Sequence, residues 1–200
     1  MRRVAGAARL VASRFATVGG KPGTTLGVSN TAIRVLEEDD AHIFQALRLR
    51  ALEDEPASFL ASHEEEAGAS MDEVRARLRA SHGPSDDFVL GAFHDIRLVG
   101  MIGLYCETRV NAHHKAKIWG VFVAREARGR GVGRALVEET VRRARMVPGL
   151  RQLQLSVSKR TPAARRLYRA VGFKTWGVEP DALCIGGTMV DEEHMALELG

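Results

Sequence analysis

The sequence predicts a single α/β (α+β) domain in which strands and helices alternate along most of the chain. Segments with strand periodicity are separated by amphipathic helical segments, and no segment is repeated. Of the 200 residues, 45% are hydrophobic and 27% are charged, which is typical of a soluble folded domain. No apolar run approaches the ~20 residues of a membrane span, and two cysteines are too few for a disulfide framework. The sequence therefore argues against membrane-spanning proteins and small secreted scaffolds.

The expected elements follow from periodicity and from turn and capping residues. In chain order they are a strand at 32–36, a helix opened by residues 37–40, a loop with a partial helical turn at 53–68, a helix at 70–81, strands at 87–94, 98–106 and 115–124, a helix at 131–146, a strand at 150–158, a helix from 161 to 172, and two or three short strands within 173–199. Strand–helix–strand crossovers of this kind are typical of a mixed sheet.

The first two helices are supported by burial spacing and by a cap. Ile43, Phe44 and Leu47 recur at helical spacing and are expected to face the core. Ser70 and Glu73 form a capping-box pattern, in which each side chain bonds the other residue's backbone N–H. These two patterns predict where the first two helices lie.

The later elements show the pattern of a buried sheet centre. Residues 115–124 are almost continuously hydrophobic, which predicts a central strand covered on both faces. Residues 150–158 alternate between apolar and polar side chains, as in a strand with one covered face. Thr161 followed by Pro162 predicts a hydroxyl N-cap and a helix start.

The basic charge of the chain is concentrated in residues 1–31, which we expect to be an extension preceding a domain at 32–200. Five of the 29 basic residues lie there, and none of the 25 acidic residues does. The net charge of +4 therefore belongs to the extension, and nucleic-acid binding by the domain is not expected. Residues 1–20 are similar to an organellar transit peptide, whereas a disordered extension and a start codon assigned too early are the alternatives.

A loop rich in glycine and arginine carries the clearest chemical signal. The central strand leads into the pattern Arg128-x-x-Gly131-x-Gly133 and then into an amphipathic helix. Glycine lets backbone N–H groups approach a ligand, and the helix N-terminus adds unpaired N–H groups and a positive dipole end. The Walker and dinucleotide glycine patterns are both absent. The loop therefore predicts a site for a phosphate or pyrophosphate of another kind.

With this loop the sequence resembles the GNAT family, the acetyl-CoA-dependent N-acetyltransferases. Arg128, Gly131 and Gly133 match the family signature of Gln or Arg, two residues, Gly, one residue, and Gly or Ala. Residues 164–173 look like the family's second motif, A-x-x-L-Y-x-x-x-G-F. The resemblance covers residues 33–199 and implies a mixed, mostly antiparallel sheet of about seven strands with a central splay, flanked by about four helices.

The resemblance also implies acetyl-CoA as cosubstrate and no metal. The backbone of 121–123 would bind the pantetheine arm, and the N–H groups of 129–134 would hold the pyrophosphate. Thr161 stands where the family often has Asn, which puts one pantetheine contact in question. The expected cofactor-binding residues are Val121, Phe122, Val123, Arg128, Gly129, Arg130, Gly131, Val132, Gly133, Arg134 and Thr161.

Acetyl transfer to an amine requires a base, hydrogen-bond donors to the thioester oxygen and an acid for the departing thiolate. By the resemblance, Tyr168 is the expected acid, whereas a packed core tyrosine is the structural alternative. His114 is the candidate base, because an imidazole accepts a proton near neutral pH. His113, Glu107 and Ser156 are the other candidates for this role.

Other residues have a functional and a structural interpretation side by side. The backbone amide of Val121 or Phe122 is the expected oxyanion donor by the resemblance. Trp119 either shapes an acceptor pocket or only fills the core. The acidic run at 64–66 either attracts a cationic amine or is a solvated face. Both cysteines are expected to be buried and unreactive.

We therefore expect an enzyme that transfers an acetyl group from acetyl-CoA to a primary amine of a small molecule, a peptide N-terminus or a lysine, by direct attack in a ternary complex. A catalytically silent acyl-CoA sensor on the same fold is the alternative. Neither a nucleic-acid nor a membrane partner is expected. The expected location is cytoplasmic, with an organelle open if the source is eukaryotic, and the sequence leaves the oligomeric state open, a homodimer included.

Overall fold

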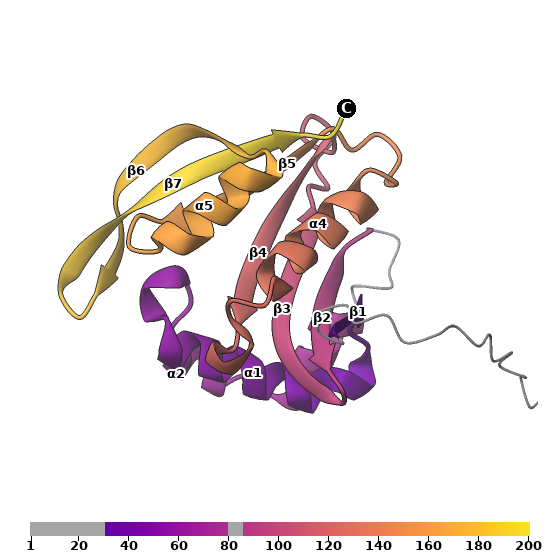
Figure 1. The fold of residues 1–200 in the computed structure, drawn as a ribbon, viewed down its shortest axis with the longest axis vertical. Helices are drawn as coiled ribbons and strands as arrows, with labels where there is room; N and C mark the ends of the chain where they lie inside the picture. Colours follow the sequence, from indigo (N-terminus) through magenta and orange to yellow (C-terminus); the bar gives the residue numbers. More distant parts are fainter. Residues whose placement is uncertain (1–30, 80–85) are drawn as a thin grey trace, which may run out of the picture.

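A seven-stranded mixed sheet forms the centre of the computed structural model, which describes residues 31–79 and 86–200 (Figure 1). Its strands are β1 (Thr31–Val35), β2 (Phe88–His94), β3 (Arg97–Cys106), β4 (Lys115–Val123), β5 (Gln152–Ser158), β6 (Lys174–Ile185) and β7 (Thr188–Glu198). Their order is β1-β2-β3-β4-β5-β7-β6, and every neighbouring pair is antiparallel except β4 and β5. The predicted mixed, mostly antiparallel sheet is confirmed.

Helices cover both faces of this sheet. Within the described residues they are α1 (Ala41–Asp54), α2 (His63–Ala67), α3 (Met71–Arg79), α4 (Val132–Ala144) and α5 (Pro162–Val171). Figure 1 shows α4 and α5 on one face and α1 and α2 on the other. The described residues thus contain five α-helices instead of about four. The additional one is the short α2, which lies in the segment expected to be a loop with a partial helical turn.

Two hydrophobic clusters fill the space between the sheet and the helices, one on each face of the sheet. Phe44 and Leu78 of α1 and α3 pack with Met101 and Phe122 of the sheet. On the opposite face, Leu136 of α4 packs in a cluster that extends under α5 to Tyr168 and Met195. Ile43 is 42% exposed, so its predicted core position is wrong, because its neighbour Phe44 is the residue that faces the sheet.

The sheet opens at its middle, between β4 and β5. These two strands pair in parallel over only three residues each, 115–117 with 152–154. Further along β4 a bulge places Gly120 and Val121 opposite the single residue Ile102 of β3. Gly120 has a φ of +64°, a backbone conformation that side chains other than glycine's rarely adopt. The bulge and the short ladder leave room between the two strands, which is the predicted splay.

The C-terminal segment is one long hairpin, so the prediction of two or three short strands there is wrong in its lengths. Gly186 and Gly187 both have positive φ and form the tight turn between β6 and β7. Pro180 lies in the edge strand β6, at an irregularity between Glu179 and Leu183 where the pairing with β7 is interrupted. The hairpin extends well past the end of α5 in Figure 1.

Other expectations have mixed outcomes. Ser70 and Glu73 form the predicted capping box at α3. The hydroxyl of Thr161 does not cap α5 but donates to the carbonyl of Ser158 at 2.8 Å. Residues 1–30, with the predicted extension, and 80–81, at the predicted helix end, lie outside the described residues. No helix in the described part is long and apolar enough to cross a membrane.

Candidate active site

A cavity of about 560 Å³ lies where α4 begins, beside the open side of β4. It brings together the end of β4, the glycine-rich loop and the start of α5, with η2 (Pro56–Ser58) closing one side. Of the residues predicted to bind the cofactor, those lining it are Val121, Phe122, Val123, Arg128, Gly129, Gly131, Val132, Gly133, Arg134 and Thr161. Tyr168 lines it as well, whereas Arg130 is exposed on the loop outside the lining.

The loop is shaped to present backbone N–H groups. Gly129 and Gly131 have φ values of +75° and +80°, and Gly131 is the N-cap of α4 without any side-chain cap. The first backbone N–H of α4 with a partner inside the helix is that of Ala135, which donates to the carbonyl of Gly131. The N–H groups of residues 132–134 are therefore available to a ligand. A Cβ at Gly131 would meet no atom within 4 Å, so the space in front of the helix is empty of protein. These features fit a pyrophosphate group.

The arginines of the loop are largely engaged by carboxylates. Arg128 donates to Glu55 at 2.9 Å and to the carbonyl of Val123, and Arg134 pairs with Glu138 at 2.7 Å. Arg130 makes no ion pair with a described residue. The backbone, more than the side-chain charge, is therefore available to an anion.

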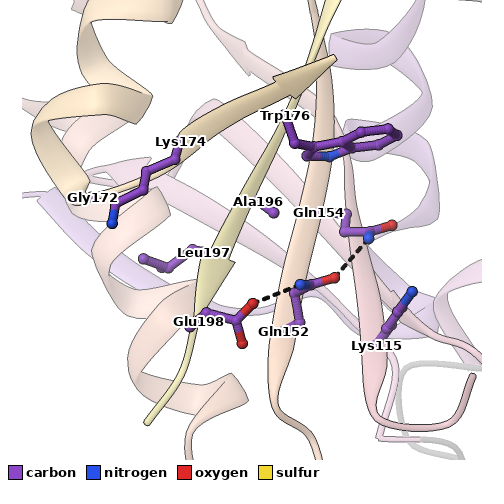
Figure 2. Close-up of a pocket in the computed structure, with 9 residues that line it drawn as sticks. All are labelled: Lys115, Gln152, Gln154, Gly172, Lys174, Trp176, Ala196, Leu197 and Glu198. Carbon is purple, nitrogen blue, oxygen red and sulfur yellow. Dashed lines mark hydrogen bonds between the residues drawn. The ribbon is translucent and has the colours of Figure 1, made fainter.

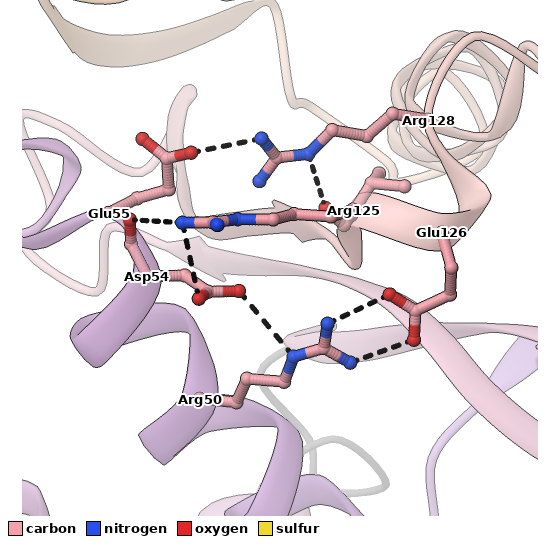
Figure 3. A network of polar contacts seen from close by, with 7 residues as sticks. Arg50, Asp54, Glu55, Arg125, Glu126 and Arg128 are labelled. Carbon is pink, nitrogen blue, oxygen red and sulfur yellow. Dashed lines mark hydrogen bonds and ion pairs between the residues drawn. The ribbon is translucent and has the colours of Figure 1, made fainter.

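The same region is tied to α1 by ion pairs (Figure 3). Arg50 binds both carboxylate oxygens of Glu126 at 2.8 Å, and Arg125 pairs with Asp54 at 3.4 Å. The bonds from Arg50 lower the pKa of Glu126 to about 2. Each exposed pair contributes little alone, but together they join the end of α1 to the turn at Arg125–Ala127 that precedes the glycine loop.

Tyr168 lies where the large cavity meets a second pocket. Its ring is 5% exposed, packs edge-on to Phe173, and lines both spaces. Burial raises the pKa of its phenol well above the ordinary value, so the oxygen keeps its proton at neutral pH. Tyr168 is therefore suited to donate a proton rather than to accept one.

The second pocket, of about 90 Å³, fills the gap between β4 and β5. Trp119, Gly120 and Val121 form one wall, Ser156 and Ser158 the other, and Ser58 of η2 lies at its border. Trp119 fits because Gly103 has no side chain, since a Cβ there would come within 2.1 Å of the indole. The indole thus both fills the core and lines the pocket.

The histidine and glutamate predicted as bases lie elsewhere. His114 precedes β4, where its carbonyl accepts the N–H groups of Arg151 and Gln152, and it lines neither space. Six residues of strand separate it from Val121, a distance of roughly 20 Å. Its neighbour His113 contacts it edge-on, in the same turn. Hydrogen bonds from Lys117 and Tyr105 lower the pKa of Glu107, which weakens it as a base.

Two of the three glutamates in the acidic run of α2 have structural roles. Glu65 caps its own helix through Ser62. Glu66 is buried and pairs with Arg48 at 3.4 Å and Arg77 at 3.0 Å. Only Glu64 of the run has neither role, so electrostatic attraction of an amine by this segment is weaker than the sequence suggests.

The cysteines differ from each other. Burial, with Asp87 and Asp86 nearby, raises the pKa of Cys106 to about 11, which disfavours the reactive thiolate. Cys184 is exposed on β6, so its predicted burial is wrong; the hairpin edge leaves it uncovered. Among the described residues no group of three or more His, Cys, Asp or Glu side chains is arranged to hold a metal ion.

A hydrogen-bonded group of three side chains adjoins the small pocket, and the sequence predicts only one of them, Ser156. Ser156 is hydrogen-bonded to His194, which is in turn hydrogen-bonded to Glu179. Ser156 and His194 face each other because β5 and β7 pair in that register. The alternation of β5 places Ser156 on the open face, but nothing in the sequence gives its partner 38 residues away.

A further hollow of about 580 Å³ lies on the open face of β5 and β7 (Figure 2). Gln152 joins Glu198 and Gln154 there through two hydrogen bonds of 2.7 Å, and Lys115 and Trp176 border it. It has no helix N-terminus and no glycine loop, so it lacks the features of the pyrophosphate site.

Comparison with known proteins agrees with this geometry. A sequence profile described as "Acetyltransferase (GNAT) family" matches residues 40–173. A GNAT-family acetyltransferase of Streptococcus pneumoniae is similar in structure, with a TM-score of 0.78 at 23% identity over 86% of this chain and 100% of that one. No curated protein matches this chain by sequence.

Two further similar structures contain the cofactor. One is yncA of Salmonella typhimurium with acetyl-CoA, with a TM-score of 0.74 and 19% identity over 85% of this chain and 94% of that chain. The other is a GNAT superfamily phosphinothricin acetyltransferase of Sinorhizobium meliloti with acetyl-CoA. Its TM-score is 0.72, with 22% identity over 85% of this chain and 89% of that chain. At these identities the likeness shows the fold.

Proposed function

Because this chain belongs to the GNAT family of acetyltransferases, we propose that it transfers the acetyl group of acetyl-CoA to a primary amine. The acceptor is a small molecule, a peptide N-terminus or a lysine. The observation that carries the proposal is the position of Tyr168 at the junction of the two spaces. One space has an anion-binding helix end, and the other is open to a second reactant.

Each group of residues has its own role in the proposed reaction. The N–H groups of 132–134 hold the pyrophosphate, and the backbone of 121–123 orients the pantetheine arm and polarises the thioester carbonyl. The amine attacks the carbonyl carbon directly from the side of the small pocket. Tyr168 gives its proton to the sulfur as the C–S bond breaks, and regains one from the nitrogen. No covalent enzyme intermediate is needed.

Release of CoA across a panel of amines tests this proposal. The panel contains the twenty free amino acids, spermidine, an alanine-initiated peptide and an N-terminally blocked lysine peptide. We expect turnover with at least one of them. Tight binding of acetyl-CoA without turnover on any amine would instead favour an acyl-CoA sensor.

Substitution of Tyr168 by phenylalanine tests the acid. Since Tyr168→Phe removes only the phenol, we expect turnover to fall at least tenfold with little change in acetyl-CoA affinity. Tyr105→Phe is the matched control, because Tyr105 is the other tyrosine, and its hydroxyl donates to Glu107 on the surface and lines neither space. Unchanged turnover in Tyr168→Phe would remove this residue from the mechanism.

A further inference from the structure

Three strands of the C-terminal half bring a serine, a histidine and a glutamate into one hydrogen-bonded chain. Ser156 Oγ of β5 lies 2.8 Å from His194 Nδ1 of β7, and His194 Nε2 lies 2.9 Å from Glu179 Oε2 of β6. The indole of Trp176 stacks on the imidazole, with ring centroids 5.2 Å apart and planes 25° apart. The imidazole is therefore fixed at both nitrogens and on one face.

The partners of the imidazole determine which nitrogen carries its proton. The ionised carboxylate of Glu179 can only accept a hydrogen bond, so Nε2 must donate to it. Nδ1 of the neutral ring then has a free lone pair, which accepts the hydroxyl proton of Ser156. This arrangement leaves the lone pairs of the Ser156 oxygen available for another donor.

That oxygen belongs to the reaction pocket. Ser156 is exposed and lines the small space between β4 and β5, together with Gly120, Val121 and Tyr168. His194 and Glu179 lie behind it and do not line the space. Any action of these two residues on a reactant must therefore pass through Ser156.

We propose that Ser156 is the residue that takes the proton of the acceptor amine, with His194 and Glu179 as its positioning residues, an inference that rests on the proposed acetyl transfer. The ammonium N–H bond breaks and its proton passes to Ser156, while the hydroxyl proton of Ser156 passes to His194 Nδ1. The neutral amine forms the N–C bond as the C–S bond breaks; Tyr168 protonates the sulfur and regains its proton from the acetylated nitrogen. The proton on His194 leaves to solvent, so one acetyl transfer from an ammonium releases one proton.

Charges around His194 favour this transfer. From β6 it faces Glu179, from β7 it is within electrostatic reach of Glu192, and from β5 it faces the neutral Ser156. The turn η2, which packs near β5 and β6, carries no titratable side chain. Both carboxylates stabilise an imidazolium, so acceptance of a proton by His194 is supported from two strands.

Kinetics of substituted proteins test the proposal, with the amine of highest turnover in the panel as acceptor. We expect Ser156→Ala and His194→Gln to lower kcat about 100-fold while the KM for acetyl-CoA changes less than twofold. Ser156→Thr keeps a hydroxyl and should retain most of the turnover. Gln154→Ala, on the same face of β5, and His94→Gln, at the far end of β2, are matched controls with unchanged rates.

The pH profile separates proton transfer from a structural role. In the wild type, kcat should fall at acidic pH, where the imidazole already carries a proton. His194→Gln should lose that acidic limb, with a rate that rises with pH only as the acceptor ammonium loses its proton to water. A merely structural histidine would lower the rate equally at all pH values.

The outcomes distinguish this proposal from the acetyl transfer on which it rests. A wild type that acetylates an amine, with Ser156→Ala equally active, overturns the relay alone. Detection by mass spectrometry of an acetyl group on Ser156 without acceptor also overturns it, because Ser156 would then be a nucleophile. A wild type that acetylates no amine overturns both, and nitrogen NMR of His194 still reports whether Nε2 is protonated.

Discussion

Single residues set the geometry of the anion site, and Gly131 is the clearest example. Its φ of +80° lets the chain turn into α4 while the N–H groups of the first helical turn point into empty space. Arg128, the most recognisable member of the sequence pattern, instead uses its side chain to hold Glu55 and the carbonyl of Val123. The glycine is thus needed for the backbone and the arginine for the position of the loop.

We expect Gly131→Asp to abolish acetyl-CoA binding, because it places a carboxylate where the pyrophosphate is expected. Isothermal titration calorimetry measures the loss. Gly149→Asp is a matched control, since Gly149 has a φ of +81° and equally open surroundings but lies outside the cavity. The two substitutions should cost similar stability, about 1–2 kcal/mol each, while only the first affects binding. Retained affinity in Gly131→Asp would mean that the anion site is misplaced.

At the scale of elements, a buried carboxylate fixes α5 to the C-terminal hairpin. Glu193 of β7 is 4% exposed and accepts hydrogen bonds from Arg165 and Arg169 of α5 and from Thr175 of β6. Burial alone would raise the pKa of Glu193, but these bonds outweigh it and hold the pKa below its ordinary value. Because α5 carries Tyr168, this carboxylate helps to position the expected acid.

A carboxyl group with a lowered pKa in the folded state stabilises the protein above its unfolded-state pKa and loses that effect as the pH falls. We therefore expect Glu193→Gln to lower the free energy of unfolding by about 2 kcal/mol at pH 7. The difference from wild type should shrink as the pH falls below about 4. Urea unfolding at several pH values measures this. Glu64→Gln, on the exposed side of α2, serves as control, and a difference that does not depend on pH would contradict the assignment.

At the scale of the whole molecule, charge and reactivity lie in different parts of the chain. The excess of basic residues is in the first thirty, whereas the described domain is nearly neutral. We expect deletion of residues 1–30 to leave acetyl transfer unchanged and to remove salt-sensitive retention on heparin. Retention that survives the deletion would show that the domain itself has a basic surface.

The sequence predicts the parts of the site that are contiguous. A strand, a glycine loop and a helix in succession form a local unit, and the structure places that unit around a cavity. Contacts that only the register of paired strands creates cannot be predicted in this way. Ser156 and His194 meet only because β5 pairs with β7 in this register, although the two residues lie 38 positions apart in the sequence. His114 has suitable chemistry, but it lies at the other end of β4 from the pocket.

The short ladder between β4 and β5 has a mechanical consequence. The two halves of the sheet share only three paired residues on each strand, and beyond them the facing edges are not joined to each other. By the proposed function, the pantetheine arm of acetyl-CoA would bind the free edge of β4 and add contacts between the two halves of the sheet. We therefore expect acetyl-CoA binding to slow backbone hydrogen exchange most in the residues of β4 and β5 beyond this short ladder.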